Sequence, residues 1–139
     1  MILSNIIGIP EVLASNGNAW AVTIYKSWVG VVVIKTKTGV DDDYGNSINS
    51  ATPRSTWETC CQWYHVNDRI TTWDVQTYTA KHYHEYTFEH KLCLIGGLYA
   101  PPDQTVSYQA GIEVKIDNGQ CLASGGGQYS YYETPGGCR

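Results

Sequence analysis

Alternating apolar and polar residues dominate the chain and predict β-strands. Between residues 20 and 25, Trp, Val and Ile alternate with Ala, Thr and Tyr, so residues of one parity would share one face of a strand. Residues 29–38 form a second, β-branched run. Residues 57–70 and 71–78 are rich in Trp, Tyr, Thr and Val, which strands favour. No window has the apolar spacing of an amphipathic helix, so we expect an all-β chain.

The clearest local pattern is a hairpin centred on Asn118-Gly119, the dipeptide that favours a two-residue type I′ turn. Before it, Ile and Val alternate with charged residues from position 112 to 117. Pairing across this turn sets Ile116 opposite Cys121. Cys121 is therefore expected to face inward with the isoleucines.

Glycine, proline and acidic residues mark the expected connections. Residues 39–46 are predicted to form a turn, and residues 47–54 a polar linker. Residues 92–98 read as an apolar strand, and residues 100–103 as a loop because tandem prolines cannot serve an interior ladder.

Strand segments that recur about every eight to twelve residues, separated by turn signals, indicate a single-domain antiparallel β-sandwich or a jelly-roll-like barrel. We expect one domain over residues 1–139, long enough for a hydrophobic core of its own. An N-terminal arm, residues 1–18, and a Gly- and Tyr-rich C-terminal segment, residues 124–139, would flank the sandwich.

The charge and hydrophobicity of the chain argue against some classes of partner. Charged residues are 16% of the chain and the formal net charge is −4, with the basic residues scattered, so we expect no nucleic-acid partner. The longest apolar run, residues 29–34, is far shorter than a bilayer, so no transmembrane segment is expected. Many surface positions must be filled by neutral polar residues and Tyr, which suits an extracellular or surface-associated protein, although the N-terminus lacks the basic region of a signal peptide.

Five cysteines fit a secreted, disulfide-containing protein, although they would also serve as small buried apolar residues in a reducing compartment. Neighbouring side chains on a strand point to opposite faces, so the adjacent pair Cys60-Cys61 is expected to have two different partners. An odd count leaves one thiol free or available for a bridge between chains. The disulfide candidates are Cys60, Cys61, Cys93, Cys121 and Cys138.

The most chemistry-rich stretch is KHYHEYTFEHK, residues 81–91. On a strand, one face would carry Lys, Glu and Thr together with Tyr83, which is typical of a solvated surface. The opposite face would carry His82, His84, Tyr86, Phe88 and His90. This alternation favours an amphipathic strand whose imidazoles hydrogen-bond in or beside the core.

A metal site is the alternative interpretation of the same stretch. Two histidines one residue apart project in parallel from a strand and could hold one transition-metal ion. His82, His84, Glu89 and Gly96 resemble the first motif of the cupin family, although Gln76 stands where that motif has its leading glycine, and no second motif follows. The resemblance implies a metal held by His82, His84 and Glu89. Apart from a metal at this motif, we expect no cofactor.

Five tryptophans and eleven tyrosines stand against one phenylalanine. Tyr and Trp combine a broad apolar face with a polar group, which suits wet interfaces and sugar rings. The ligand-binding candidates are Trp57, Trp63, Tyr64, Tyr129, Tyr131 and Tyr132.

These observations favour a non-catalytic, lectin-like or toxin-like recognition protein that binds carbohydrate or another cell-surface ligand. No pattern of catalytic residues is recognisable, so an enzyme is the less favoured class. One alternative is a structural subunit of a filament, capsid or other homo-oligomer, supported by the odd cysteine. The cupin-like metalloprotein is the other.

Overall fold

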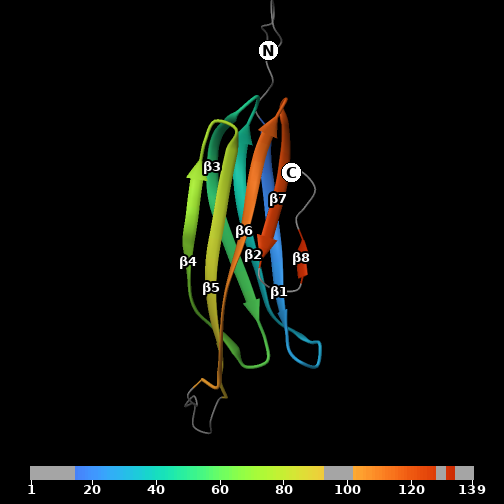
Figure 1. Cartoon of the computed structure of the whole chain (residues 1–139), viewed down its shortest axis with the longest axis vertical. Helices are drawn as coiled ribbons and strands as arrows, with labels where there is room; N and C mark the ends of the chain where they lie inside the picture. Colours follow the sequence, from blue (N-terminus) through green and yellow to red (C-terminus); the bar gives the residue numbers. More distant parts are fainter. Residues whose placement is uncertain (1–14, 93–101, 128–130, 134–139) are drawn as a thin grey trace, which may run out of the picture.

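The computed structural model describes residues 15–92, 102–127 and 131–133 and shows an all-β protein (Figure 1). Within these ranges there is no helix, and therefore none that could cross a membrane. The strands are β1 (Ser15–Lys26), β2 (Val32–Tyr44), β3 (Ile48–Thr59), β4 (Trp63–Val75), β5 (Thr79–His90), β6 (Gln104–Asp117), β7 (Gln120–Gly127) and β8 (Tyr131–Glu133).

The strands form two antiparallel sheets, in the orders β3-β2-β1-β8 and β4-β5-β6-β7. The two sheets pack face to face along the long axis of the molecule (Figure 1). The predicted β-sandwich is thus confirmed, in its open form rather than as a closed barrel. Pro53, which has no N–H for a ladder, lies in the edge strand β3, where one side of the backbone needs no partner.

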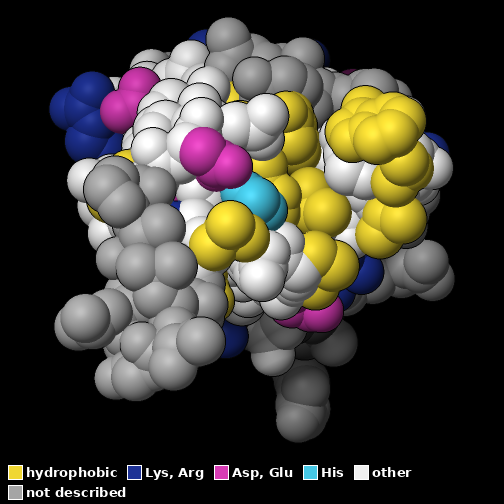
Figure 2. All heavy atoms as spheres, turned by 90° about the horizontal axis from the view of Figure 1, so that it is seen from below, with side chains coloured by type: hydrophobic (Ala, Val, Ile, Leu, Met, Phe, Trp, Pro, Cys, Tyr) yellow, Lys and Arg dark blue, Asp and Glu magenta, His cyan; other side chains and the backbone are white. Residues whose placement is uncertain are grey.

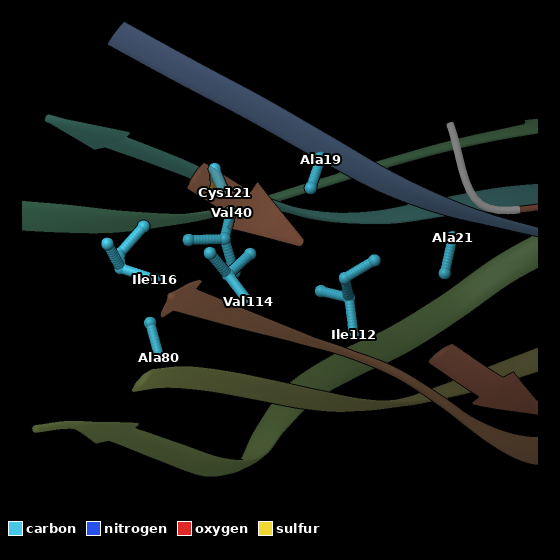
Figure 3. Packing of buried hydrophobic residues seen from close by; sticks show 8 residues of the cluster. All are labelled: Ala19, Ala21, Val40, Ala80, Ile112, Val114, Ile116 and Cys121. Atoms are coloured by element: carbon cyan, nitrogen blue, oxygen red, sulfur yellow. The ribbon is translucent and has the colours of Figure 1, made fainter. Parts of the chain in front are cut away.

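The core lies between the sheets as two apolar clusters. One consists of small and aliphatic residues from both sheets, shown in Figure 3: Ala19, Ala21, Val40, Ala80, Ile112, Val114, Ile116 and Cys121. The other is rich in aromatic rings and contains Val33, Ile34, Trp63, Tyr86, Phe88, Val106, Tyr108 and Ala110. Alternate residues of each strand supply them, because successive side chains point to opposite faces of a sheet.

Hydrogen bonds between buried side chains also link the two sheets. The hydroxyl groups of Thr36 and Tyr108 lie 2.7 Å apart, and those of Thr38 and Tyr86 lie 2.9 Å apart. All four side chains are almost completely shielded from water. Because buried hydroxyl groups are costly without a partner, these bonds favour the one alignment of the sheets that satisfies both pairs.

The predicted hairpin is confirmed. Ile116 pairs with Cys121, and Cys121 is 8% exposed. Asn118 and Gly119 have φ values of 51° and 76°, as a type I′ turn requires.

The turn and linker predicted over residues 39–54 are wrong, because these residues continue two strands. Asp41, Asp42 and Asp43 pair with residues 16–18 of β1 on one side and with residues 50–52 of β3 on the other. The polar sequence suggested a loop, yet ladder hydrogen bonds use the backbone and tolerate polar side chains near the end of a sandwich. The connection between β2 and β3 is only residues 45–47.

Several expected features fall partly outside the described residues. Of the apolar run 92–98, only Leu92 is described, and it is not in a strand. Ser15 to Asn18, at the end of the expected N-terminal arm, belong to β1. In the expected C-terminal segment, residues 124–127 continue β7 and residues 131–133 form β8 beside β1.

Candidate functional site

A pocket of about 450 Å³ opens at one end of the sandwich. It lies among the β1–β2 turn, the β3–β4 turn, the end of β5 and the start of β6. Figure 2 looks at this end of the molecule and shows hydrophobic side chains gathered on it, with a histidine and an acidic group beside them. A pocket of this volume suits a small ligand.

The β1–β2 turn forms one wall of the pocket. Ser27 N–H donates to the Val31 carbonyl at 2.8 Å, and Gly30 N–H donates to the Ser27 carbonyl at 2.8 Å. Gly30 has a φ of 88°, a left-handed conformation that glycine adopts readily. The turn presents Trp28 with 97% of its surface exposed and Val29 with 61% exposed.

The β3–β4 turn forms another part of the wall and carries a disulfide between the adjacent residues Cys60 and Cys61. The expectation of two different partners is wrong because the pair lies in a turn rather than on a strand. Cys61 and Gln62 have φ values of 62° and 71°, which turn the chain sharply and remove the alternation that separates neighbours on a strand. Cys61 lines the pocket.

Aromatic rings form the floor. Trp63 is 5% exposed, and its ring meets that of Tyr25 edge to face, with the ring centres 5.6 Å apart. The imidazole of His90 also lies beside Trp63, with the ring centres 5.3 Å apart. The tryptophan therefore positions both neighbouring rings that line the pocket.

The polar side of the pocket is built from His90, Asp103 and Gln104. His90 Nδ1 lies 2.7 Å from Asp103 Oδ1, and Asp103 N–H donates to the His90 carbonyl at 3.0 Å. The backbone bond extends the β5–β6 pairing beyond its last pair, and the side-chain contact fixes the carboxylate at the pocket. The Asp103 side chain remains 60% exposed, so it can also accept hydrogen bonds from a ligand.

The histidine stretch forms β5, and its predicted inner face is confirmed. His82, His84, Tyr86 and Phe88 are between 0% and 4% exposed. His90, at the end of the strand, is half-buried. The imidazoles are hydrogen-bonded, as the amphipathic-strand interpretation predicted.

These hydrogen bonds form a chain from the core to β4. His82 Nδ1 lies 2.8 Å from the Gly39 carbonyl, and His82 Nε2 lies 2.9 Å from His84 Nδ1. His84 Nε2 contacts Asp68 Oδ1 at 2.5 Å, and the other carboxylate oxygen lies 2.6 Å from His65 Nε2. We call His82, His84, Asp68 and His65 the histidine chain.

The direction of each hydrogen bond follows from its acceptors. A carbonyl only accepts, so His82 Nδ1 carries the hydrogen. Burial, followed by the nearby His84, lowers the pKa of His82 although the Gly39 carbonyl opposes this, so His82 is neutral and its Nε2 accepts from His84. Burial raises the pKa of Asp68, but the hydrogen bonds from His84 and His65 outweigh burial and the net pKa is lowered. The ionised Asp68 carboxylate accepts hydrogen bonds from His84 Nε2 and His65 Nε2.

The residues of the cupin-like motif do not converge on one point. His82 and His84 point into the sandwich, whereas Glu89 has the opposite parity on a strand that pairs with β6 without interruption from Thr79 to His90. In the described part of the chain, no three His, Cys, Asp or Glu side chains are placed to hold a metal ion. Gly96 lies outside that part.

The aromatic candidates are dispersed. Trp63 lies in the pocket floor, whereas Trp57 belongs to the other sheet and stacks on His65 with the ring centres 3.9 Å apart. The ammonium group of Lys91 lies 5.6 Å from the ring centre of Tyr64. The backbone of Tyr131 and Tyr132 lies in β8. Tyr129 is outside the described residues, as are Cys93 and Cys138, while Cys121 is disulfide-bonded.

Most pocket residues were absent from the sequence-based candidates. The sequence predicts Trp63 as a ligand-binding residue and Cys61 only as a disulfide candidate. It assigns no ligand site to Tyr25, Trp28, His90 or Asp103. One available signal was Ser-Trp-Val-Gly at residues 27–30, where a glycine interrupts an apolar run as a turn would. The pocket forms where three separate connections meet, and no local sequence pattern predicts that they do so.

Comparison of the chain with protein-family models, with curated proteins and with solved structures finds no match.

Proposed function

We propose that the protein is a non-catalytic recognition protein that binds carbohydrate in the end pocket. The observation that carries this proposal is a cavity of about 450 Å³ in which aromatic rings and hydrogen-bonding groups face the same space. A volume in this range is typical of sites that bind small molecules. The low charge and the excess of Tyr and Trp over Phe agree with it.

Each wall of the pocket supplies an interaction that a sugar needs. The apolar C–H faces of a sugar ring pack on aromatic rings, here Tyr25 and the exposed Trp28. Sugar hydroxyl groups donate to carboxylates and exchange hydrogen bonds with amides, here Asp103 and Gln104. The hydrogen bond to His90 holds Asp103 in place before a ligand arrives, which reduces the entropy lost on binding.

The described pocket favours binding over hydrolysis. Most glycoside hydrolases use two carboxyl groups that flank the bond to be broken. Among the described residues that line this pocket, Asp103 is the single carboxylate. Its hydrogen-bonded partner is a histidine rather than a second acid.

The test is a glycan array followed by calorimetric titration of the best ligand with Asp103→Ala, Gln104→Ala and the parent chain. Asp103→Ala should weaken binding about tenfold to a hundredfold, because a hydrogen bond to a charged group contributes about 1.5–3 kcal/mol. Asp117→Ala, at the opposite end of β6, is the matched control and should bind as the parent does. A blank array, or equal affinity for parent and Asp103→Ala, would refute the proposal.

A further inference from the structure

The turn between β1 and β2 exposes an apolar surface that the fold does not use. Trp28 is 97% exposed, and Val29, Val31 and Val32 are 61%, 48% and 40% exposed. We call these four residues the apolar tip. Burying a tryptophan or a valine stabilises a fold, so side chains held in water at this density indicate a contact outside the chain.

The tip is held outward by its own hydrogen bonds. The Ser27 side-chain oxygen accepts from Val31 N–H at 3.3 Å, in addition to the two backbone bonds across the turn. These contacts satisfy N–H groups of Ser27, Gly30 and Val31 within the turn itself. Because some of the N–H groups of the turn are hydrogen-bonded within it, moving the turn out of bulk water costs less free energy.

The position of the tip determines what it can reach. The β1–β2 turn lies at the same end of the sandwich as the β3–β4 turn (Figure 1). Hydrophobic side chains gather on this end of the molecule, as Figure 2 shows. The tip can therefore contact a surface that approaches this end of the sandwich.

The size of the tip argues against a second protein as the occupant. A tryptophan side chain buries at most about 250 Å², so one tryptophan and three partly exposed valines offer on the order of 500 Å². A stable protein interface needs about 800 Å² from each partner. A bilayer has no such threshold, because a small convex group can enter its interface alone. Trp is also enriched at that depth, where its ring is apolar and its N–H can reach headgroups or water.

We propose that the apolar tip inserts into the interfacial layer of a phospholipid membrane. The net charge is −4, and at this end the Asp103 carboxylate offsets the exposed Lys26 that precedes the turn, so charge provides little attraction toward anionic lipids. The ligand is therefore a zwitterionic bilayer, and burial of apolar surface drives its binding. Insertion stops at the headgroup layer because the hairpin backbone still needs polar neighbours there. The inference does not depend on carbohydrate binding, although Trp28, Val29 and Val31 also line the pocket.

The test is sedimentation of the protein with vesicles of pure phosphatidylcholine, which carry no sugar headgroup. The parent chain should bind equally at about 0.1 M and about 1 M salt, because screening weakens ionic attraction but not apolar burial. Trp28→Ser and Val29→Asp should each lower the partition coefficient at least tenfold. Tyr78→Ser and Val75→Asp are the matched controls, since Tyr78 and Val75 are 55% and 42% exposed near the β4–β5 turn, and these variants should bind as the parent does.

Separate outcomes distinguish this proposal from the carbohydrate site. Asp103→Ala should lose sugar binding and keep vesicle binding. Failure of the parent chain to sediment with the vesicles would overturn the membrane proposal and leave the carbohydrate proposal standing. Unchanged partitioning of Val29→Asp would overturn it as well, and so would self-association in solution that Trp28→Ser abolishes, because a second copy would then cover the tip.

Discussion

At the scale of single residues, close packing determines which positions tolerate no change. Gly39 lies against the ring of Trp20, and a Cβ atom there would come within 2.6 Å of a ring carbon. The same glycine offers its carbonyl to His82. Gly111 faces Tyr83 across the β5–β6 pair, and the tyrosine ring covers the space that a side chain would need. Both glycines therefore admit an aromatic ring from a neighbouring strand.

Asp42 is the buried charge that the fold accommodates least well. It is 5% exposed, and its Oδ1 atom has no hydrogen-bond partner. Burial, together with the neighbouring Asp41 and Asp43, raises its pKa to about 6, despite a backbone hydrogen bond that acts in the opposite direction. A carboxyl whose pKa is higher in the fold binds a proton more readily there than in the unfolded chain. Above pH 6 the ionised group therefore destabilises the protein.

We expect Asp42→Asn to stabilise the protein at pH 7. The asparagine carries no charge, so the free energy of unfolding should rise by about 1–3 kcal/mol, the range that a pKa displacement of this size implies. The gain should disappear below about pH 4, where the parent carboxyl is protonated in both states. Urea unfolding at both pH values measures it. Asp74→Asn, which removes an exposed carboxylate, is the control, and a gain at pH 7 that persists below pH 4 would contradict the explanation.

At the scale of elements, the sequence predicted strands well where the alternation of apolar and polar residues was complete. The inner face of β5 and the pairing of Ile116 with Cys121 both followed from period-two patterns and turn chemistry. Prediction failed at residues 39–54, where acidic and small polar residues occupy paired strands. It also failed at Cys60-Cys61, where left-handed turn conformations override the alternation. The local alternation of apolar and polar residues predicts which face of a strand a side chain occupies. The pocket, in contrast, is formed by connections that come together only in the folded protein.

The hydrogen bond between Thr36 in β2 and Tyr108 in β6 tests how the two sheets are held together. Thr36→Val and Tyr108→Phe each remove one side of this buried bond. Each should lower the free energy of unfolding by about 0.5–1.5 kcal/mol, the net contribution of one hydrogen bond, because the partner loses this bond while Thr36 also contacts the Thr23 carbonyl. The double variant should lose less than the sum of the two, with a coupling of about 1 kcal/mol. Denaturant unfolding of all four proteins closes the cycle, and strict additivity would show that the two hydroxyl groups do not depend on each other.

At the scale of the whole molecule, the buried titratable groups respond to acid in opposite ways. The pKa of His82 is lowered in the fold, so the unfolded chain takes up the proton more readily as the pH falls through about 6.5 and stability is lost. The pKa of Asp68 is also lowered, and its contribution is lost below about 3.8. Asp42 acts in the opposite sense, because protonation between about 6 and 3.8 relieves a buried charge. The opposing effects partly cancel in the parent chain.

Removing Asp42 should therefore reveal the histidine chain. In an Asp42→Asn background, we expect the melting temperature to fall steadily from pH 7 to pH 5, because protonation of His82 is then favoured in the unfolded state alone. Adding His82→Asn keeps an N–H group beside the Gly39 carbonyl but removes the titrating ring. This second change should lower the melting temperature at pH 7 and flatten its slope between pH 7 and pH 5. The slope is the informative quantity, since loss of packing alone would shift the whole curve and leave its pH dependence unchanged.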